Sequence, residues 1–264
     1  MVALRNPMTS DHSIMRTSLL PNLLVALSRN LKFGLSDVAL FEVGSVFLAR
    51  GADELPEEPA RLAGVLAGRR IGWLGDIPPV DFYDARGAVE VVLAELLTEE
   101  RAIRFERLDA GRTPFLHPGV AADVFVDGAL VGQVGEVHPA VRAAFEIEAR
   151  AFAFDLDVAA LPVPGPRQMR PIVRFPAITR DLSLFVSADL PAAQVGDLIR
   201  DPLIEGVRVL EEYRDPDKVP PGQKGLLWSI TYRSSEKTLT DAEVDSRHET
   251  LVAHLLEKLA ATRR

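Results

Sequence analysis

The sequence predicts an α+β protein with two parts, an antiparallel sheet module followed by a domain of element order β-α-β-β-α-β. Its 264 residues are enough for two hydrophobic cores. Short runs that alternate apolar and polar residues, separated by turn formers, predict strands in both halves. Clustered prolines separate the halves, because they favour extended backbone and remove sheet donors. These prolines are Pro162, Pro164, Pro166, Pro171 and Pro176. We therefore expect a first module over 1–161, a linker over 162–173 and a second domain over 174–264.

The first module opens with an amphipathic helix and a long hairpin. Leucines recur at helical spacing after Pro21, a residue suited to a first turn, and Gly34 ends the run. These leucines are Leu23, Leu24, Leu27 and Leu31. Val38–Leu48 and Leu62–Ala67 then read as two strands joined by an acidic, proline-containing loop.

The rest of the first module combines helices with a second hairpin. Asp84–Leu97 has an apolar helical stripe, and Asp84 is predicted to be its N-cap. Asp127-Gly128 stands between two alternating runs, Val120–Val126 and Leu130–Val137, a strong signal for a type I′ turn. The remaining elements are a short helix opened by His138-Pro139 and a strand over Ala151–Val158.

The second domain begins with a strand in which Leu182, Leu184 and Val186 alternate with Ser183 and Phe185. The elements that follow are a helix over Pro191–Arg200, strands over Val207–Tyr213 and Leu226–Arg233, a helix capped by Thr240 and Glu243, and a fourth strand within Ala260–Arg264. This order is the split βαβ, or ferredoxin-like, arrangement of four antiparallel strands with both helices on one face. The other face of the sheet is then open.

An open sheet face with polar groups, an aromatic ring and cations is suited to single-stranded RNA. If the first and third strands are neighbours, three arginines share that face with hydroxyl groups and Phe185. These residues are Arg174, Arg180, Arg233, Ser183, Ser229 and Thr231. The simpler alternative is that Arg180 pairs with Asp181 and that the face is only solvated.

Composition limits the classes of function. The net charge is −8, with 17 basic and 23 acidic residues in 1–170 and 13 and 15 in 171–264. Neither half is a basic nucleic-acid binder, so any RNA contact depends on a local patch and on a partner. No apolar run reaches the roughly 20 residues of a membrane helix. The absence of cysteine excludes disulfides and thiolate metal sites and agrees with a cytoplasmic location.

The histidines do not form a recognisable catalytic or metal motif. None of the five has the spacing of a zinc site. His117 and His138 each precede a proline and read as turn residues. An independent hydrolase using either histidine lacks a nucleophile elbow, and no glycine pattern matches a phosphate-binding loop.

Several motifs together resemble one family. Arg174-Phe175-Pro176, Arg180-Asp181-Leu182-Ser183 and the segment Lys237–Asp245 resemble the ferredoxin-fold anticodon-binding domain that ends the β subunit of bacterial phenylalanyl-tRNA synthetase. The first half is similar to the catalytic-like module of the same subunit in the segments 6–21, Leu40–Gly44, Phe115–Gly119 and Gly132–Pro139. The resemblance covers essentially the whole chain. Because the family's subunit is much longer, we expect a C-terminal fragment or a separately encoded piece.

The resemblance implies a class II synthetase-like first module without an active site. In the family, the α subunit activates phenylalanine with ATP and Mg²⁺, so we expect no catalytic residue, cofactor or metal in this chain. The strand Ala151–Val158 agrees with the absence of an active site. It contains no glycine, and we expect no arginine to face it. Asp155 and Asp157 would repel a triphosphate. The partners implied are tRNA(Phe) and the α subunit, in a cytoplasmic α2β2 assembly.

The resemblance also implies a tRNA-binding set. Arg174, Arg180, Asp181 and Ser183 match the family motif, and strand alternation adds Phe185 and Arg233. The alternative interpretation is a ferredoxin-like regulatory or protein-interaction module without tRNA specificity, which the acidic net charge also suits.

Overall fold

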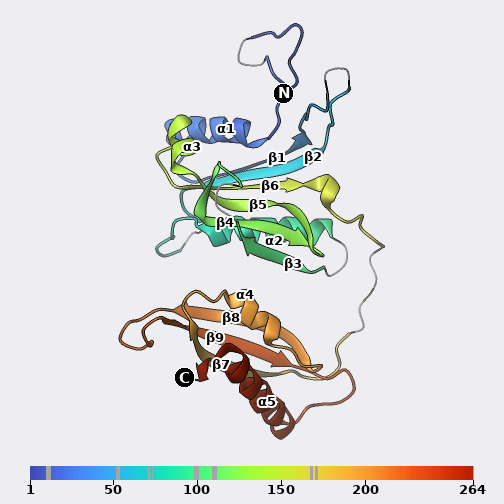
Figure 1. Ribbon diagram of the computed structural model, residues 1–264, viewed down its shortest axis with the longest axis vertical. Coiled ribbons are helices and arrows are strands. Elements are labelled where there is room, and N and C mark those ends of the chain that lie inside the picture. Colours follow the sequence, from blue (N-terminus) through green and yellow to red (C-terminus); the bar gives the residue numbers. More distant parts are fainter. Residues whose placement is uncertain are drawn as a thin grey trace. The chain divides into compact units, whose positions relative to one another are not determined.

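The computed structural model describes residues 1–9, 13–51, 54–70, 72, 74–97, 101–108, 112–166, 169 and 172–263. It divides the chain into two compact units, Met1–Gln168 and Met169–Arg264, each with its own sheet (Figure 1). The two sheets and their helices confirm the predicted α+β class. No helix in the described part of the chain combines the length and apolar character that crossing a membrane requires.

The first unit is built on a six-stranded sheet of order β1-β2-β6-β5-β4-β3, in which every neighbouring pair is antiparallel. Its strands are β1 (Val38–Ser45), β2 (Ala60–Ala67), β3 (Ile103–Arg107), β4 (Leu116–Val126), β5 (Ala129–Val137) and β6 (Ala151–Asp157). Its helices are α1 (Leu20–Lys32), α2 (Phe82–Leu96), α3 (Pro139–Ala144) and the short 3₁₀ turn η2 (Val158–Ala160). Strand β3 was not predicted from the sequence.

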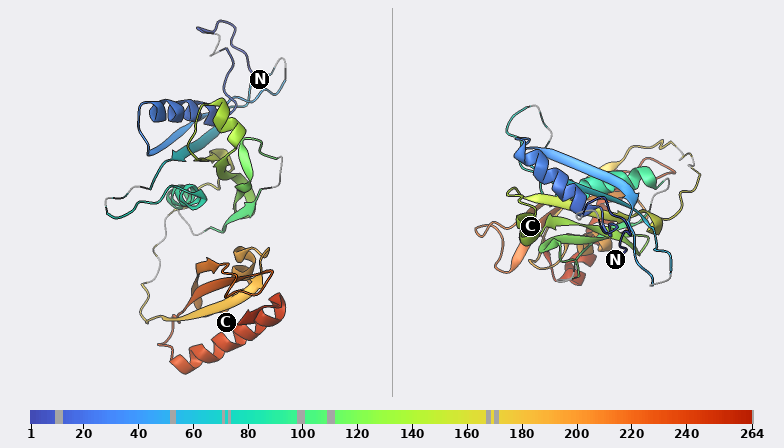
Figure 2. Two further views of the ribbon diagram at one scale, coloured as in Figure 1. Left: turned by 90° about the vertical axis from the view of Figure 1, so that its left-hand side faces the viewer. Right: turned by 90° about the horizontal axis from the view of Figure 1, so that it is seen from above.

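Both faces of this sheet carry a hydrophobic core. Strand β6 is buried from Ala151 to Leu156 because its alternate side chains enter different cores. Ala151 and Ala153 belong to the cluster that contains α1, whereas Phe152 and Phe154 belong to the cluster that contains α2. Small residues on one face and large ones on the other therefore place one helix on each side, as Figure 2 also shows.

Among the local signals in the first unit, the type I′ turn was confirmed and one helix start was wrong. Asp127 and Gly128 have φ values of 50° and 83°, as a type I′ turn requires, and join β4 to β5. Helix α2 begins three residues earlier than predicted, with Asp81 as its N-cap. The predicted cap, Asp84, instead accepts the Asp81 backbone N–H at 2.7 Å, so the two carboxylates form a reciprocal capping box.

The second unit has the predicted ferredoxin-like topology, with strand order β10-β7-β9-β8. Its elements are β7 (Ile178–Ser187), α4 (Ala192–Leu198), β8 (Ile204–Tyr213), β9 (Gln223–Tyr232), α5 (Asp241–Leu259) and β10 (Thr262–Arg263). Helices α4 and α5 pack on the same face, since their buried residues share one cluster with alternate residues of β7 and β9. Thr240 and Glu243 form the predicted capping box of α5.

One polar pair lies inside this core. His248 of α5 is buried, and its Nδ1 lies 3.1 Å from the Tyr232 hydroxyl of β9. Burial lowers the pKa of His248 and raises the pKa of Tyr232 to about 12. The histidine that interrupts the leucine stripe of α5 is therefore a hydrogen-bonded core residue.

Candidate nucleic-acid interface

The candidate interface is the face of the second sheet that is turned away from α4 and α5. Strands β7 and β9 are direct neighbours, with Asp181 opposite Ser229 and Ser183 opposite Leu227. Because Leu182 and Leu184 point into the core, the residues between them belong to the other face. Asp181, Ser183, Phe185, Ser229 and Thr231 are thus on the open face, as the alternation predicted.

Two aromatic rings lie together on this face. Phe185 of β7 and Tyr213 of β8 meet edge to face, with ring centroids 6.2 Å apart. The Tyr213 hydroxyl lies 3.3 Å from the Ser183 Oγ. Between the two strands, Gly225 of β9 leaves space for the Tyr213 ring, since a Cβ there would stand 2.0 Å from a ring carbon. Both rings are half-buried, so each keeps surface on which a base could stack.

Sequence reasoning missed Tyr213, and the reason is a β-bulge. Simple alternation from Val207 would send Tyr213 into the core. The register between β8 and β9 shifts between Val209 and Glu211, so Leu210 is an extra residue and Tyr213 lies opposite Gly225 on the open face. An aromatic residue at the end of a predicted strand was the only sequence signal.

Arg180 does not lie on the open face, and this part of the prediction was wrong. It has the same parity as Leu182, so its side chain is on the helix side of the sheet. There its guanidinium donates to Asp241 at 2.6 Å and to Asp245 at 2.7 Å, both on α5. These two hydrogen bonds, the one to Asp241 first, raise the pKa of Arg180. The alternative of a local pair with Asp181 is also wrong.

Arg174 and Arg233 lie at the end of the sheet where β7 and β8 begin. Arg233 donates to the Glu205 carboxylate at 2.8 Å and to the Phe175 carbonyl at 3.0 Å. Arg174 precedes the strand and is exposed. A cavity of about 700 Å³ brings both arginines together with Phe175, Glu205 and Ser234. The two arginines are therefore near one another but beside the open face and not at its centre.

The charge on the open face is mixed. Asp181, Ser229 and Arg208 form one row across β7, β9 and β8, and Asp181 and Arg208 are both exposed. Glu211, three residues after Arg208 and opposite Leu227, adds a second exposed carboxylate. Such a surface offers ring faces and hydrogen-bonding groups more than it offers net positive charge, so stacking and base-edge contacts would dominate over phosphate contacts.

The first unit has an arginine where none was expected. Arg61 of β2 donates to Asp155 at 2.8 Å and to Asp157 at 3.2 Å, both on β6. Burial raises the pKa of Asp155, and the Arg61 charge partly opposes that rise. On the other face, the Phe154 ring fills the space beside Gly64, where a Cβ would be 2.5 Å away. Arg61 is therefore already paired with two aspartates, and these residues do not fit a triphosphate.

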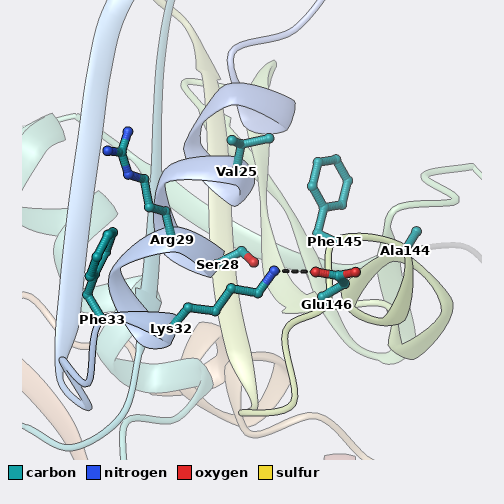
Figure 3. A pocket seen from close by; sticks show the side chains of 8 residues that line it. All are labelled: Val25, Ser28, Arg29, Lys32, Phe33, Ala144, Phe145 and Glu146. Carbon is teal, nitrogen blue, oxygen red and sulfur yellow. Dashed lines mark hydrogen bonds and ion pairs between the residues drawn. The ribbon is translucent and has the colours of Figure 1, made fainter.

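A groove between α1 and α3 marks a second exposed surface (Figure 3). Its volume is about 490 Å³, and Val25 of α1 and Phe33, the C-cap residue of that helix, are exposed beside it at 56% and 76%. Lys32 and Glu146 pair across the groove, and the Arg29 guanidinium lies 5.7 Å from the centre of the Phe33 ring. Helix α1 contains no acidic residue, so its outer side is both apolar and basic.

The described residues include no cluster of three or more histidine or carboxylate groups arranged to hold a metal ion.

Comparisons with known proteins agree on one family. The model described as "Phenylalanyl tRNA synthetase beta chain CLM domain" matches residues 1–158, and "Ferredoxin-fold anticodon binding domain" matches residues 173–264. The phenylalanine–tRNA ligase beta subunit of Geobacter sulfurreducens is 38% identical over 99% of this chain and 33% of its own length. That of Moorella thermoacetica is 40% identical over 100% of this chain and 33% of its own length. The chain thus spans about a third of the length of these curated relatives.

A solved pyrrolysyl-tRNA synthetase of Desulfitobacterium hafniense is similar over 54% of this chain and 47% of its own chain, with 15% identity and a TM-score of 0.38, which is too low to support a conclusion.

Proposed function

Since the chain belongs to the phenylalanyl-tRNA synthetase β-chain family, we propose that it binds the anticodon region of tRNA(Phe) with its second unit and supports a catalytic α subunit with its first. The observation that carries the tRNA role is the match of residues 173–264 to the anticodon-binding family. The Phe185–Tyr213 pair on the open sheet face supports it, because aromatic rings beside hydroxyl and amide groups are the usual means of holding unpaired bases.

The proposed contact surface differs from the predicted one. Phe185, Tyr213 and Ser183 form its centre, and Asp181 and Arg208 supply base-edge contacts on either side of Ser229. Arg174 and Arg233, in the cavity at the sheet end, are proposed to hold the flanking phosphates. Arg180 has a structural role in this proposal, joining β7 to α5.

We further propose that ATP and Mg²⁺ act on the α subunit and not on this chain. The support is that Arg61 already pairs with both Asp155 and Asp157, so one positive charge faces two carboxylates and no cation is left over for a triphosphate. The isolated chain is then expected to give no phenylalanine-dependent pyrophosphate exchange. Exchange without added α subunit would contradict this part of the proposal.

The α1–α3 groove is the proposed contact for the α subunit, in an α2β2 assembly. Val25 and Phe33 offer apolar surface, and Arg29 offers a cation for an acidic neighbour. Co-purification tests this contact: Phe33→Asp should abolish capture of the α subunit. Phe41→Asp is a matched control, since Phe41 is 75% exposed on β1, away from the groove. Equal loss in both variants, or in neither, would contradict the assignment.

Binding of tRNA is tested by fluorescence anisotropy over a series of salt concentrations. Wild-type protein should prefer a tRNA(Phe) transcript to one with a replaced anticodon, and a few phosphate contacts should give a negative slope of affinity against salt. Phe185→Ala should remove the preference. If the tRNA transcript binds no better than a random RNA, the protein is a ferredoxin-like interaction module and the tRNA role fails.

A further inference from the structure

Strand β1 differs from the other strands that end a sheet in this protein. The four outer strands are β1 and β3 in the first sheet (Figure 1) and β10 and β8 in the second. Three of them are unsuited to pairing with a further strand: β10 has two residues, β3 has five and exposes three charged side chains, and register shifts interrupt β8. Strand β1 instead pairs with β2 over eight consecutive residues without a shift. Among the described residues, it is thus the one outer strand that is both long and regular.

The outer side of β1 combines free backbone groups with apolar side chains. In the part of the chain that the structure describes, no backbone hydrogen bond joins β1 to any segment other than β2. Leu40 packs on the α1 side of the sheet, so Ala39, Phe41 and Val43 belong to the α2 side. There α2 packs on β5 and β6, and Phe41 and Val43 remain 75% and 59% exposed. An extended segment that pairs with β1 would satisfy its backbone and cover these side chains.

The charge of β1 indicates which segment fits it. Glu42 is the only charged residue of the strand, and it forms an ion pair with Arg16, whose Nε also donates to the Ser45 carbonyl at 2.9 Å. Two copies of a chain with a net charge of −8 repel each other. They can nevertheless approach at β1, where the single carboxylate is already neutralised. A second copy supplies the same regular, apolar and neutral strand, and is therefore complementary to the first in charge and in hydrophobicity.

We propose that β1 pairs antiparallel with β1 of a second copy of the chain, across a two-fold axis at Phe41. In such a symmetric pair one residue lies opposite its own copy, and residues equally far from it on either side face one another. With Phe41 on the axis, an aromatic pair forms at the centre and Ala39 faces Val43 of the second copy, both of which favour pairing. With Glu42 on the axis, two carboxylates would lie opposite each other, which is unfavourable. This contact goes beyond the proposed function, because it involves neither tRNA nor the α subunit.

Sedimentation equilibrium of the full chain at increasing concentration tests the contact. The wild type should reach twice the mass of one chain, and Phe41→Asp, verified as folded by urea unfolding, should stay monomeric because it brings two carboxylates to the axis. Val91→Asp is the matched control, since Val91 is 66% exposed on α2, and it should dimerise as the wild type does. Phe33→Asp should dimerise even if it loses the α subunit, so the two contacts fail separately. A wild type that is monomeric at every concentration, or a Phe41→Asp variant that dimerises equally, would overturn the proposal.

Cross-linking tests the register, since the chain has no cysteine of its own. Residues directly opposite each other in an antiparallel pair have Cα atoms about 4.5–5.5 Å apart, within the roughly 4.4–6.8 Å that a disulfide spans. A mixture of Ala39→Cys and Val43→Cys chains should therefore oxidise to a mixed dimer. Neither variant alone should cross-link, nor should a mixture of Ala39→Cys with Val91→Cys. Equal yields of dimer from the first mixture and from these controls would overturn the proposed pairing.

Discussion

Replacing Tyr213 by alanine should weaken RNA binding more than any other single change on the open sheet face. The Tyr213 ring fills the space above Gly225 and orients Phe185 by its edge, so its loss removes one stacking surface and frees the other. Stacking of a base on an aromatic side chain contributes about 1–3 kcal/mol. The dissociation constant should therefore rise by roughly 5-fold to 150-fold.

The assay is anisotropy of a labelled anticodon stem-loop at one fixed salt concentration, with urea unfolding to verify that each variant is folded. Tyr213→Phe is the matched control, because it keeps the ring and removes the hydroxyl that contacts the Ser183 Oγ. Its affinity should stay within about threefold of the wild type, the cost of one neutral hydrogen bond. The reasoning is refuted if folded Tyr213→Ala binds as the wild type does, or if Tyr213→Phe loses as much affinity as Tyr213→Ala.

Three further predictions concern residues away from that face. Arg180→Met should lower the free energy of unfolding by only about 1 kcal/mol, because the two aspartates that Arg180 pairs with are exposed. The affinity for RNA should not change. A large loss of RNA affinity in the folded variant would show that Arg180 belongs to the interface. Arg61→Met should cost about 3 kcal/mol by leaving buried Asp155 without its cation, and an unchanged urea midpoint would contradict this. Since burial lowers the pKa of His248 in the folded state, the unfolded state takes up the proton first as pH falls below about 6.5, so stability should decrease there and the decrease should vanish in His248→Gln; equal pH dependence in both proteins would exclude this cause.

Local signals in the sequence determined most of the fold. The turn at Asp127-Gly128 and the box of Thr240 with Glu243 depend on residues within a few positions of each other, and the structure has both. Strand β3 was missed because only five residues, Ile103–Arg107, form it and their apolar positions are few. It is a strand because β4 offers it a free edge, which no local pattern reveals.

The site was predicted less well because its decisive contacts join distant residues. Arg180 and Asp241 are 61 positions apart, and Arg61 and Asp155 are 94 apart. Whether an arginine faces solvent or a helix depends on carboxylates that only the folded chain brings near. The family motif includes Arg180, but its position opposite Ile230 assigns its side chain to the helix side of the sheet.

The β-bulges in β8 also disfavour strand pairing between two copies of the chain through this strand. This strand is an outer strand of the second sheet, and it exposes Val209 and Leu210 at 47% and 48%. A straight, apolar outer strand would offer a continuous ladder of unpaired amides on which another chain could add a strand and begin aggregation. The two register breaks in β8, after Ile204 and after Val209, interrupt that ladder and bend it. The exposed apolar edge at Val209 and Leu210 is therefore a poor template for strand addition by a second copy of the chain.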